Sequence, residues 1–406
     1  MDLEDFDSGL PAATPREVGL DGARLQQLSD AFAARVSGGS LAGAVLAVMR
    51  AGRVCWVDAI GYRDAQQRVP MTVDSLFRLY SMTKPIASVA AMTLAEQGRL
   101  LLAEPVSSWL PSFANQQVAV IEGTGTPRSV SLVPAQTPAT VRDLLRHTAG
   151  LQNEVLFESN PVKESYRRAG LASGKLSLAE WTDVLGTQPL AYHPGTTFDY
   201  SHATAVLGRL IEVVSGEALD SFITRTVTGP LGMRDTTFQI APQDWVRLAE
   251  PTLDRATGER PPLLDLKKPP ARLSAGAGLA GTARDYLRFA AMLLNEGELD
   301  GVRILSPATL SFMLSDHLGG IRTDTTSARI LLGGYGFGLG FAVRTSDGGA
   351  AYPGSVGDAY WGGMAGTQFW VDPVQELAVV MLIQQPAELS STWNLLRQMV
   401  YAALTG

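Results

Sequence analysis

The sequence predicts an α/β fold in which one antiparallel sheet is built from both ends of the chain, with a mainly helical domain inserted between them. Strand-like apolar runs occur near the start, over residues 43–49 and 54–57. Similar runs return near the end, over residues 335–343, 366–371 and 377–383. Because these runs flank a middle with helical spacing of its apolar residues, we expect the two ends to share a sheet that is flanked by helices.

The N-terminal elements follow from local patterns. Residues 50–53 (Arg-Ala-Gly-Arg) separate the first two strand-like runs and predict a hairpin. A longer helical pattern covers residues 85–96. Apolar residues at helical spacing predict an earlier helix near residues 20–37; these are Leu25, Leu28, Phe32 and Val36.

The middle of the chain, from about 104 to 240, is helical and rich in loops, and residues 241–275 are rich in proline and charge. We expect residues 1–105 and 276–406 to form the α/β domain. Residues 106–275 would form the mainly helical domain, with a long loop near the active site. Further helices are expected over residues 140–146, 203–215, 219–227, 283–295 and 391–404.

Composition limits the possible partners. The chain has 406 residues, of which 46% are hydrophobic, and this is enough for a substantial core. A net charge of −7 and a pI near 5.3 argue against binding of nucleic acid or of anionic membranes. We therefore expect neither as a partner, while the oligomeric state is left open.

Cellular location is inferred from three features. Cys55 is the one cysteine, so no intramolecular disulfide can form, and its apolar neighbours predict a place in the core. The first seven residues are acidic and do not resemble a secretory signal. No stretch is long and apolar enough to span a bilayer. These features predict a cytoplasmic protein.

Ser81 and Lys84 form a Ser-x-x-Lys pattern at the start of the helix expected over residues 85–96. Residues three apart lie on one face of a helix, so the Lys84 amine can reach the Ser81 hydroxyl. A serine hydroxyl becomes an effective nucleophile when an adjacent base removes its proton. The pattern is short, however, and it also fits an N-cap serine followed by a solvated lysine.

Two later motifs could complete such a site. Tyr200 precedes the helix expected over residues 203–215, and its hydroxyl could relay a proton between the serine and a leaving group. The alternative is a half-buried aromatic ring whose hydroxyl meets the backbone. Gly362 and Gly363 follow Trp361 and would let an edge strand approach a substrate, or they could form only a bulge or turn.

In their order along the chain, Ser81-Met82-Thr83-Lys84, Tyr200-Ser201-His202 and Trp361-Gly362-Gly363 resemble the motifs of the penicillin-recognising serine enzymes. The tyrosine and Trp-Gly-Gly motifs are similar to those of family VIII carboxylesterases, whose fold resembles that of class C β-lactamases. The resemblance spans residues 20–405, and it implies a β-lactamase-like fold.

The resemblance also implies a role for each residue. Ser81 would be the acylated nucleophile, Lys84 its base partner, and Tyr200 the group that exchanges protons with Ser81 Oγ. The backbone N–H groups of Ser81 and Met364 would hold the oxyanion. The implied substrate-binding residues are Trp361, Gly362, Gly363 and His202.

Two positions depart from the lactam-hydrolysing relatives, which carry a lysine in place of Trp361 and an asparagine in place of His202. The lysine attracts a substrate carboxylate, so its loss favours neutral esters. We therefore expect a serine carboxylesterase that hydrolyses short-chain carboxylic esters through an acyl-enzyme on Ser81. The partner expected from these motifs is a small-molecule ester substrate. An acyltransferase with an alcohol acceptor, a weak β-lactamase, and an inert binding or structural protein on the same fold remain as alternatives.

Other chemistries fit less well. A Ser-His-Asp hydrolase would need a Gly-x-Ser-x-Gly turn, and the near match at residues 38–42 precedes a strand instead of linking strand to helix. A single cysteine and the lack of a His-Glu-x-x-His motif argue against a zinc site. We expect neither metal nor cofactor. The four histidines considered for catalysis are His147, His193, His202 and His317.

Overall fold

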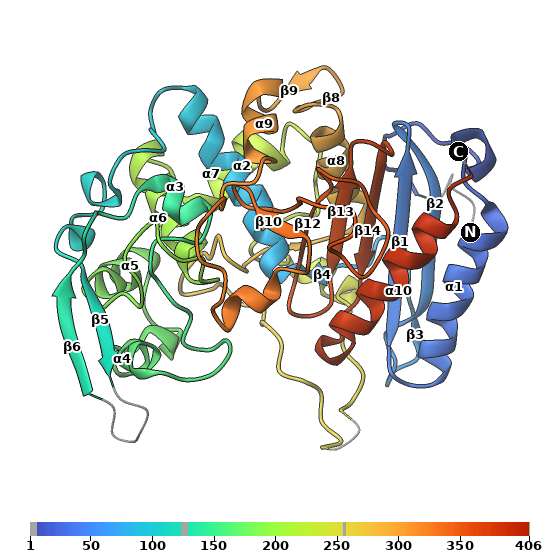
Figure 1. Ribbon diagram of the computed structural model, residues 1–406. Helices are drawn as coiled ribbons and strands as arrows, with labels where there is room; N and C mark the ends of the chain where they lie inside the picture. Colours follow the sequence, from blue (N-terminus) through green and yellow to red (C-terminus); the bar gives the residue numbers. More distant parts are fainter. Residues whose placement is uncertain (1–5, 123–128, 255–256, 406) are drawn as a thin grey trace.

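An eight-stranded antiparallel sheet joins the two ends of the chain (Figure 1). The computed structural model describes residues 6–122, 129–254 and 257–405. Strand β1 (Gly43–Arg50) pairs with β14 (Leu377–Leu382), so N-terminal and C-terminal strands lie side by side within the sheet. The prediction of one antiparallel sheet from both termini is therefore confirmed. The order is β10-β11-β12-β13-β14-β1-β2-β3, and the other strands are β2 (Arg53–Asp64), β3 (Val69–Pro70), β10 (Tyr335–Phe337), β11 (Ala342–Arg344), β12 (Ala359–Gly362) and β13 (Gln368–Asp372).

The hairpin predicted between the first two strands is present. Ala51 and Gly52 connect β1 to β2 with φ angles of 50° and 72°. Two successive positive φ angles are typical of the two-residue turns whose twist matches that of antiparallel strands.

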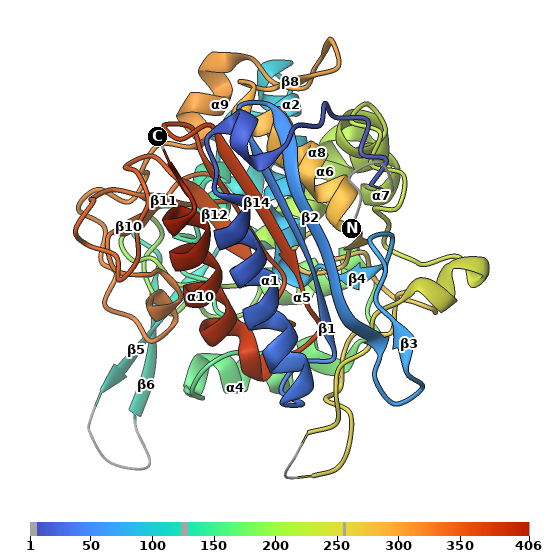
Figure 2. The same ribbon diagram turned by 90° about the vertical axis from the view of Figure 1, so that its right-hand side faces the viewer.

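Helices cover both faces of the sheet, which explains the continuous apolar sequences of β1 and β14. Helix α1 (Gly22–Ser37) and helix α10 (Leu389–Ala402) pack beside each other on one face (Figure 2). Helix α8 (Ala283–Leu294) covers the opposite face, against β1, β13 and β14.

The middle of the chain is mainly helical but also contains a hairpin that the sequence analysis missed. Strands β5 (Gln117–Glu122) and β6 (Ser129–Pro134) pair with each other and project from the helices (Figure 1). Short apolar runs do not distinguish strand from helix by periodicity, and this explains the error. The division into two domains stays a prediction. The helices here are α3 (Val141–Leu145), α4 (Pro161–Arg168), α5 (Leu178–Gly186), α6 (Ala203–Ser215) and α7 (Leu219–Ile223), which continues as the π-helical turn Thr224–Thr228.

One expected strand is interrupted by a turn, and another begins two residues later than expected because a turn precedes it. The run over residues 335–343 is divided into β10 and β11, because residues 338–341 leave the ladder. Gly340 has a φ of 99° and lies against Ser88, where a side chain would clash. The run expected over residues 366–371 corresponds to β13, which begins at Gln368 after a turn at residues 363–367 that connects it to β12.

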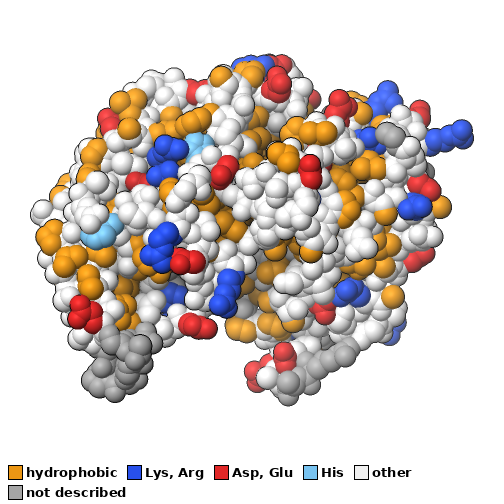
Figure 3. Space-filling model, viewed as in Figure 1, with side chains coloured by type: hydrophobic (Ala, Val, Ile, Leu, Met, Phe, Trp, Pro, Cys, Tyr) orange, Lys and Arg blue, Asp and Glu red, His pale blue; other side chains and the backbone are white. Residues whose placement is uncertain are grey.

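Further expectations concerned Cys55, the acidic N-terminus, membrane-spanning segments and the charge of the chain. Cys55 is buried on β2, as predicted, and burial raises the pKa of its thiol to about 12. The first five residues of the acidic N-terminus lie outside the described residues. None of the helices described is both long and apolar enough to cross a membrane. On the face drawn in Figure 3, charged side chains of both signs are interspersed.

A buried ion pair joins helix α10 to the sheet. Arg397 Nη1 and Nη2 lie 3.0 and 3.2 Å from the two carboxylate oxygens of Asp358, and neither side chain is exposed. The guanidinium is also surrounded by aromatic rings, including those of Trp370 and Trp393 at 4.5 and 4.8 Å. Two buried charges are stable together only while each retains its partner.

We predict that Arg397→Ala lowers the free energy of unfolding by about 3–5 kcal/mol, because it leaves the Asp358 carboxylate buried without its strongest partner. Urea denaturation measures this difference. Arg322→Ala, which removes an exposed ion pair with Asp324, is the control and should cost about 1 kcal/mol or less. Equal losses in the two variants would contradict the prediction.

Candidate active site

Three of the predicted site residues meet at the start of helix α2 (Thr83–Glu96), which runs between the sheet and the helices of the middle segment (Figure 1). Lys84 Nζ donates a hydrogen bond to Ser81 Oγ at 3.1 Å. Tyr200 Oη donates to the same oxygen at 2.7 Å. Lys84 Nζ also lies 4.7 Å from the centre of the Tyr200 ring. One hydroxyl oxygen is therefore held by both proposed proton-transfer groups.

The non-catalytic alternative for Ser81 and Lys84 does not match this geometry. Ser81 lies in the 3₁₀ turn Tyr80–Met82, and the N-cap of α2 is Met82, with no side-chain cap. Lys84 is not solvated, because only 6% of it is exposed. Its amine donates a second hydrogen bond, at 2.6 Å, to the carbonyl oxygen of Gly276.

Two short strands place Ser81 before the helix begins. Strand β4 (Phe77–Arg78) pairs with β7 (Ala280–Gly281). The next residue, Leu79, donates its N–H to the Leu279 carbonyl at 2.9 Å, and the Leu279 N–H donates to Thr83 Oγ1 at 3.1 Å. These contacts fix the segment that carries the serine on both sides.

The residue before Ser81 has a strained backbone. Tyr80 has a φ of 47°, which is uncommon for a residue with a large side chain. Such strain persists only where surrounding contacts hold it, and it concentrates at functional sites. Here the Tyr80 hydroxyl accepts a hydrogen bond of 2.8 Å from the Leu264 N–H.

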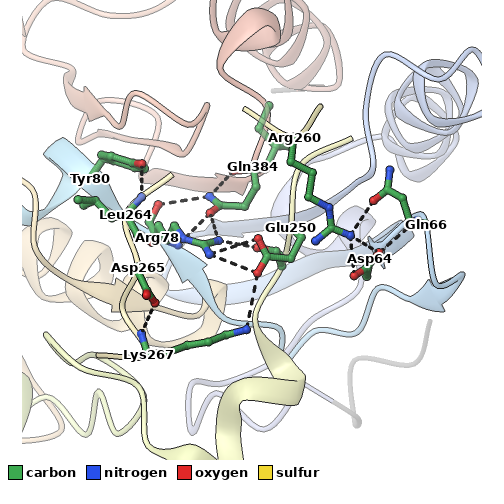
Figure 4. A network of polar contacts seen from close by, with 12 residues as sticks. Asp64, Gln66, Arg78, Tyr80, Glu250, Arg260, Leu264, Asp265, Lys267 and Gln384 are labelled. Atoms are coloured by element: carbon green, nitrogen blue, oxygen red, sulfur yellow. Dashed lines mark hydrogen bonds and ion pairs between the residues drawn. The ribbon is translucent and has the colours of Figure 1, made fainter. Parts of the chain in front are cut away.

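A polar network fastens the long segment around residues 249–268 to the chain just before Ser81 (Figure 4). Arg78 Nε donates to the Leu264 carbonyl at 2.6 Å, and Arg78 Nη1 donates to the Ala249 carbonyl at 2.9 Å. The guanidinium also pairs with Glu250 at 3.2 Å. Ala249, Glu250 and Leu264 are therefore held against two residues that lie shortly before Ser81, mostly through their backbone groups.

The backbone N–H groups of Ser81 and Met364 are available for an oxyanion, since neither has a hydrogen-bond acceptor among the residues that the structure describes. Gly363 brings the Met364 segment close to the serine. A Cβ atom at Gly363 would overlap the Leu79 carbonyl oxygen and Thr367 Oγ1. Only glycine allows this approach.

Trp361 is buried beside Tyr200 and packs against its ring. Its side chain is only 2% exposed and packs against the rings of Tyr200 and Phe337, with centroid distances of 5.3 and 5.2 Å. Its indole N–H is buried and has no hydrogen-bond partner among the described residues. The tryptophan therefore orients Tyr200 by packing, and its direct contact with substrate stays a prediction.

His202 is bound to a residue that the sequence analysis did not identify. His202 Nε2 lies 2.5 Å from Glu154 Oε2, and the imidazole packs edge-on against Trp181 at 5.0 Å. Burial raises the pKa of Glu154, but the hydrogen bond and electrostatic attraction of His202, together with a backbone hydrogen bond and nearby Arg272, hold the pKa below its ordinary value. A single glutamate in a loop has no sequence signal that could have revealed this pairing.

The histidines do not form a Ser-His-Asp arrangement, because the side chains that hydrogen-bond to Ser81 Oγ among the described residues are Lys84 and Tyr200. His147 packs 4.8 Å from the Tyr200 ring, and burial, with Lys84 nearby, holds its pKa well below the ordinary value. It is therefore a neutral support for Tyr200. In the part of the chain that the structure describes, no three His, Cys, Asp or Glu residues are grouped to hold a metal ion.

An antiparallel sheet with a serine and a lysine at a neighbouring helix start and a tyrosine across from them is characteristic of serine enzymes of the β-lactamase type. The chain belongs to the Beta-lactamase family, whose match covers residues 28–399.

Comparison with individual proteins agrees with this assignment. The chain is 32% identical over 416 residues to Esterase EstB of Burkholderia gladioli, covering 96% of this chain and 98% of that protein. The structure of EstCE1, described as a hydrolase with promiscuous acyltransferase activity, is 30% identical with a TM-score of 0.75, covering 93% of this chain and 99% of that one. Simvastatin synthase (LovD) from Aspergillus terreus has a TM-score of 0.78 at 24% identity, covers 93% of this chain and 98% of its own, and shows the shared fold.

We predict that Gly363→Ala lowers kcat by about 100-fold, because displacement of the Met364 segment removes one oxyanion donor. Steady-state kinetics with a short-chain ester measure the change. Gly348→Ala is the control, since a Cβ atom there meets nothing within 4 Å. Unchanged kcat in Gly363→Ala would argue against an oxyanion donor at this position.

Proposed function

We propose that the protein is a serine carboxylesterase that hydrolyses short-chain carboxylic esters through an acyl-enzyme on Ser81. The observation that carries this proposal is the position of Ser81 Oγ within hydrogen-bond distance of both Lys84 Nζ and Tyr200 Oη. The 32% identity to an esterase over nearly the full chain supports the same reaction. The cytoplasmic location and the absence of nucleic-acid and membrane partners stay predictions.

Acylation requires the Ser81 proton to leave as the hydroxyl attacks. The uncharged amine of Lys84 takes up this proton, directly or through the Tyr200 hydroxyl, as the bond from Oγ to the carbonyl carbon forms. The negative charge on the carbonyl oxygen is stabilised by the N–H groups of Ser81 and Met364. Tyr200 then returns the proton to the alkoxy oxygen as the ester C–O bond breaks, so the alcohol leaves neutral.

Deacylation reverses these steps with water in place of the alcohol. Tyr200 and Lys84 accept a proton from the attacking water, and a bond forms between the water oxygen and the acyl carbon. The bond to Ser81 Oγ breaks, and the proton returns to that oxygen. The products are the alcohol and the carboxylic acid, and the enzyme is regenerated.

The alternative functions differ in the molecule that attacks the acyl-enzyme or in the molecule that enters the active site. An acyltransferase would admit an alcohol instead of water, and EstCE1 is described as having such an activity in addition to hydrolysis. A β-lactamase would need to attract an anionic lactam, but position 361 carries an uncharged, buried tryptophan. The hydrogen bonds of Lys84 and Tyr200 to Ser81 Oγ argue against an inert binding protein, because binding alone does not require an activated serine.

We expect Ser81→Ala, Lys84→Ala and Tyr200→Phe each to lower kcat for 4-nitrophenyl butyrate by about 1,000-fold or more. Because the three groups act as one unit, the losses should be strongly non-additive. The double variant Lys84→Ala/Tyr200→Phe should be hardly slower than the worse single variant. A loss equal to the product of the single losses would show that the two groups act independently.

We also expect the wild-type protein to have a higher kcat/KM for 4-nitrophenyl butyrate than for a chromogenic cephalosporin. The reason is that position 361 carries a tryptophan and not a lysine that could attract the cephalosporin carboxylate. Including an acceptor alcohol, with product analysis by chromatography, ranks transfer against hydrolysis in the same assay. A cephalosporin turned over as well as the ester would favour the lactamase alternative, and a predominantly transesterified product would favour the acyltransferase. Failure of a fluorophosphonate to label Ser81 would favour the inert protein.

A further inference from the structure

The chain from Gln152 to Glu158, termed here the rim segment, is fastened to the motif that carries Tyr200. Gln152 Nε2 donates to Asp199 Oδ2 at 2.8 Å, and the Gln152 carbonyl accepts from the His202 N–H at 3.3 Å. The Glu154 carboxylate binds His202, as described above. Three contacts therefore join the start of this segment to residues 199–202, directly beside the active-site tyrosine.

Helix α4 fastens the same segment from its other side. Lys163 Nζ donates to the carbonyl oxygens of Leu156 and Glu158 at 2.5 and 3.0 Å. Arg167 Nη2 donates to the Glu154 carbonyl at 2.5 Å, and Arg167 Nη1 donates to Ser159 Oγ at 2.6 Å. Two cationic side chains thus bind backbone oxygens of this loop, while Leu156 packs against the hydrophobic core.

The apolar side chains of the rim segment remain in contact with solvent. Val155 is 67% exposed and Phe157 is 43% exposed. Phe157 also has a φ of 61°, a backbone conformation that an aromatic residue seldom adopts. Lys163 Nζ also lies 5.7 Å from the centre of the Phe157 ring, so this ring contacts the cation that binds the loop and still exposes apolar surface to solvent.

We propose that Val155 and Phe157 are specificity-determining residues that bind an apolar chain of the ester where it leaves the active site. This inference rests on the proposed esterase function and adds the substrate class: esters with an apolar group longer than the acyl-enzyme site itself can enclose. Val155 directly follows Glu154, which binds His202 two residues after Tyr200, so the rim segment borders the site. Their exposed surface loses water when such a chain lies on it, which favours binding.

The test uses the full-length protein and four variants. Val155→Thr keeps the side-chain shape but makes it polar, and Phe157→Asn replaces the ring with a residue that tolerates a positive φ. These two variants and their double variant are compared with Val374→Thr. Val374 is also 67% exposed but lies in the connection between β13 and β14, and it serves as the matched control.

Two ester series identify which part of the substrate is bound. The acyl series compares 4-nitrophenyl acetate with 4-nitrophenyl octanoate, and the alcohol series compares ethyl butyrate with octyl butyrate, all below their aggregation limits. In one series, we expect the double variant to lower the ratio of kcat/KM for the long ester to that for the short ester by about tenfold. Val374→Thr should leave both ratios as they are in the wild-type protein.

The outcomes separate this inference from the proposed function. The series in which the ratio falls identifies the acyl or the alcohol chain as the bound group. If the ratio does not change in either series, or if Val374→Thr changes it equally, the inference is wrong while esterase activity that depends on Ser81 still stands. If the Ser81→Ala variant hydrolyses these esters as fast as the wild-type protein, the proposed function itself fails.

Discussion

The arrangement around Ser81 Oγ is the constraint on which the rest of the structure depends. This oxygen accepts hydrogen bonds from Lys84 Nζ and Tyr200 Oη, which come from segments more than one hundred positions apart in the chain. A displacement of about 1 Å in either group can cost two orders of magnitude in rate. The fold must therefore hold the start of α2, the chain before α6 and the carbonyl of Gly276 in one rigid arrangement.

The contacts that achieve this are mostly made to backbone groups. Arg78 binds the carbonyls of Ala249 and Leu264, and Lys84 binds the carbonyl of Gly276. Lys163 and Arg167 act in the same way on the loop beside Tyr200. Backbone groups cannot change rotamer, so a loop held through its carbonyls has a defined position, and its side chains remain free to contact a substrate.

The aromatic rings behind Tyr200 have a different role. Trp361, His147 and Phe337 pack around this residue or around one another, and His147 is neutral because it is buried. They restrict the tyrosine ring to one orientation without adding a charge beside its hydroxyl. Position 361, where lactam-hydrolysing relatives carry a lysine, is occupied here by a tryptophan that packs against Tyr200. The absence of a positive charge at this position agrees with the proposed preference for neutral esters.

The sequence by itself determined the sheet from both termini, the helix that follows Ser81 and the three motifs, because these depend on local periodicity and on residue types at fixed spacing. It did not reveal the β5–β6 hairpin, because short apolar runs do not distinguish strand from helix. The turn that divides residues 335–343 and the pairing of Glu154 with His202 were also missed, because they depend on contacts between segments distant in the chain, such as that of Gly340 with Ser88. The family resemblance named Tyr200 as a partner of Ser81, but only the tertiary structure gives their geometry, because a hydrogen bond across 119 positions has no periodicity that a sequence could display.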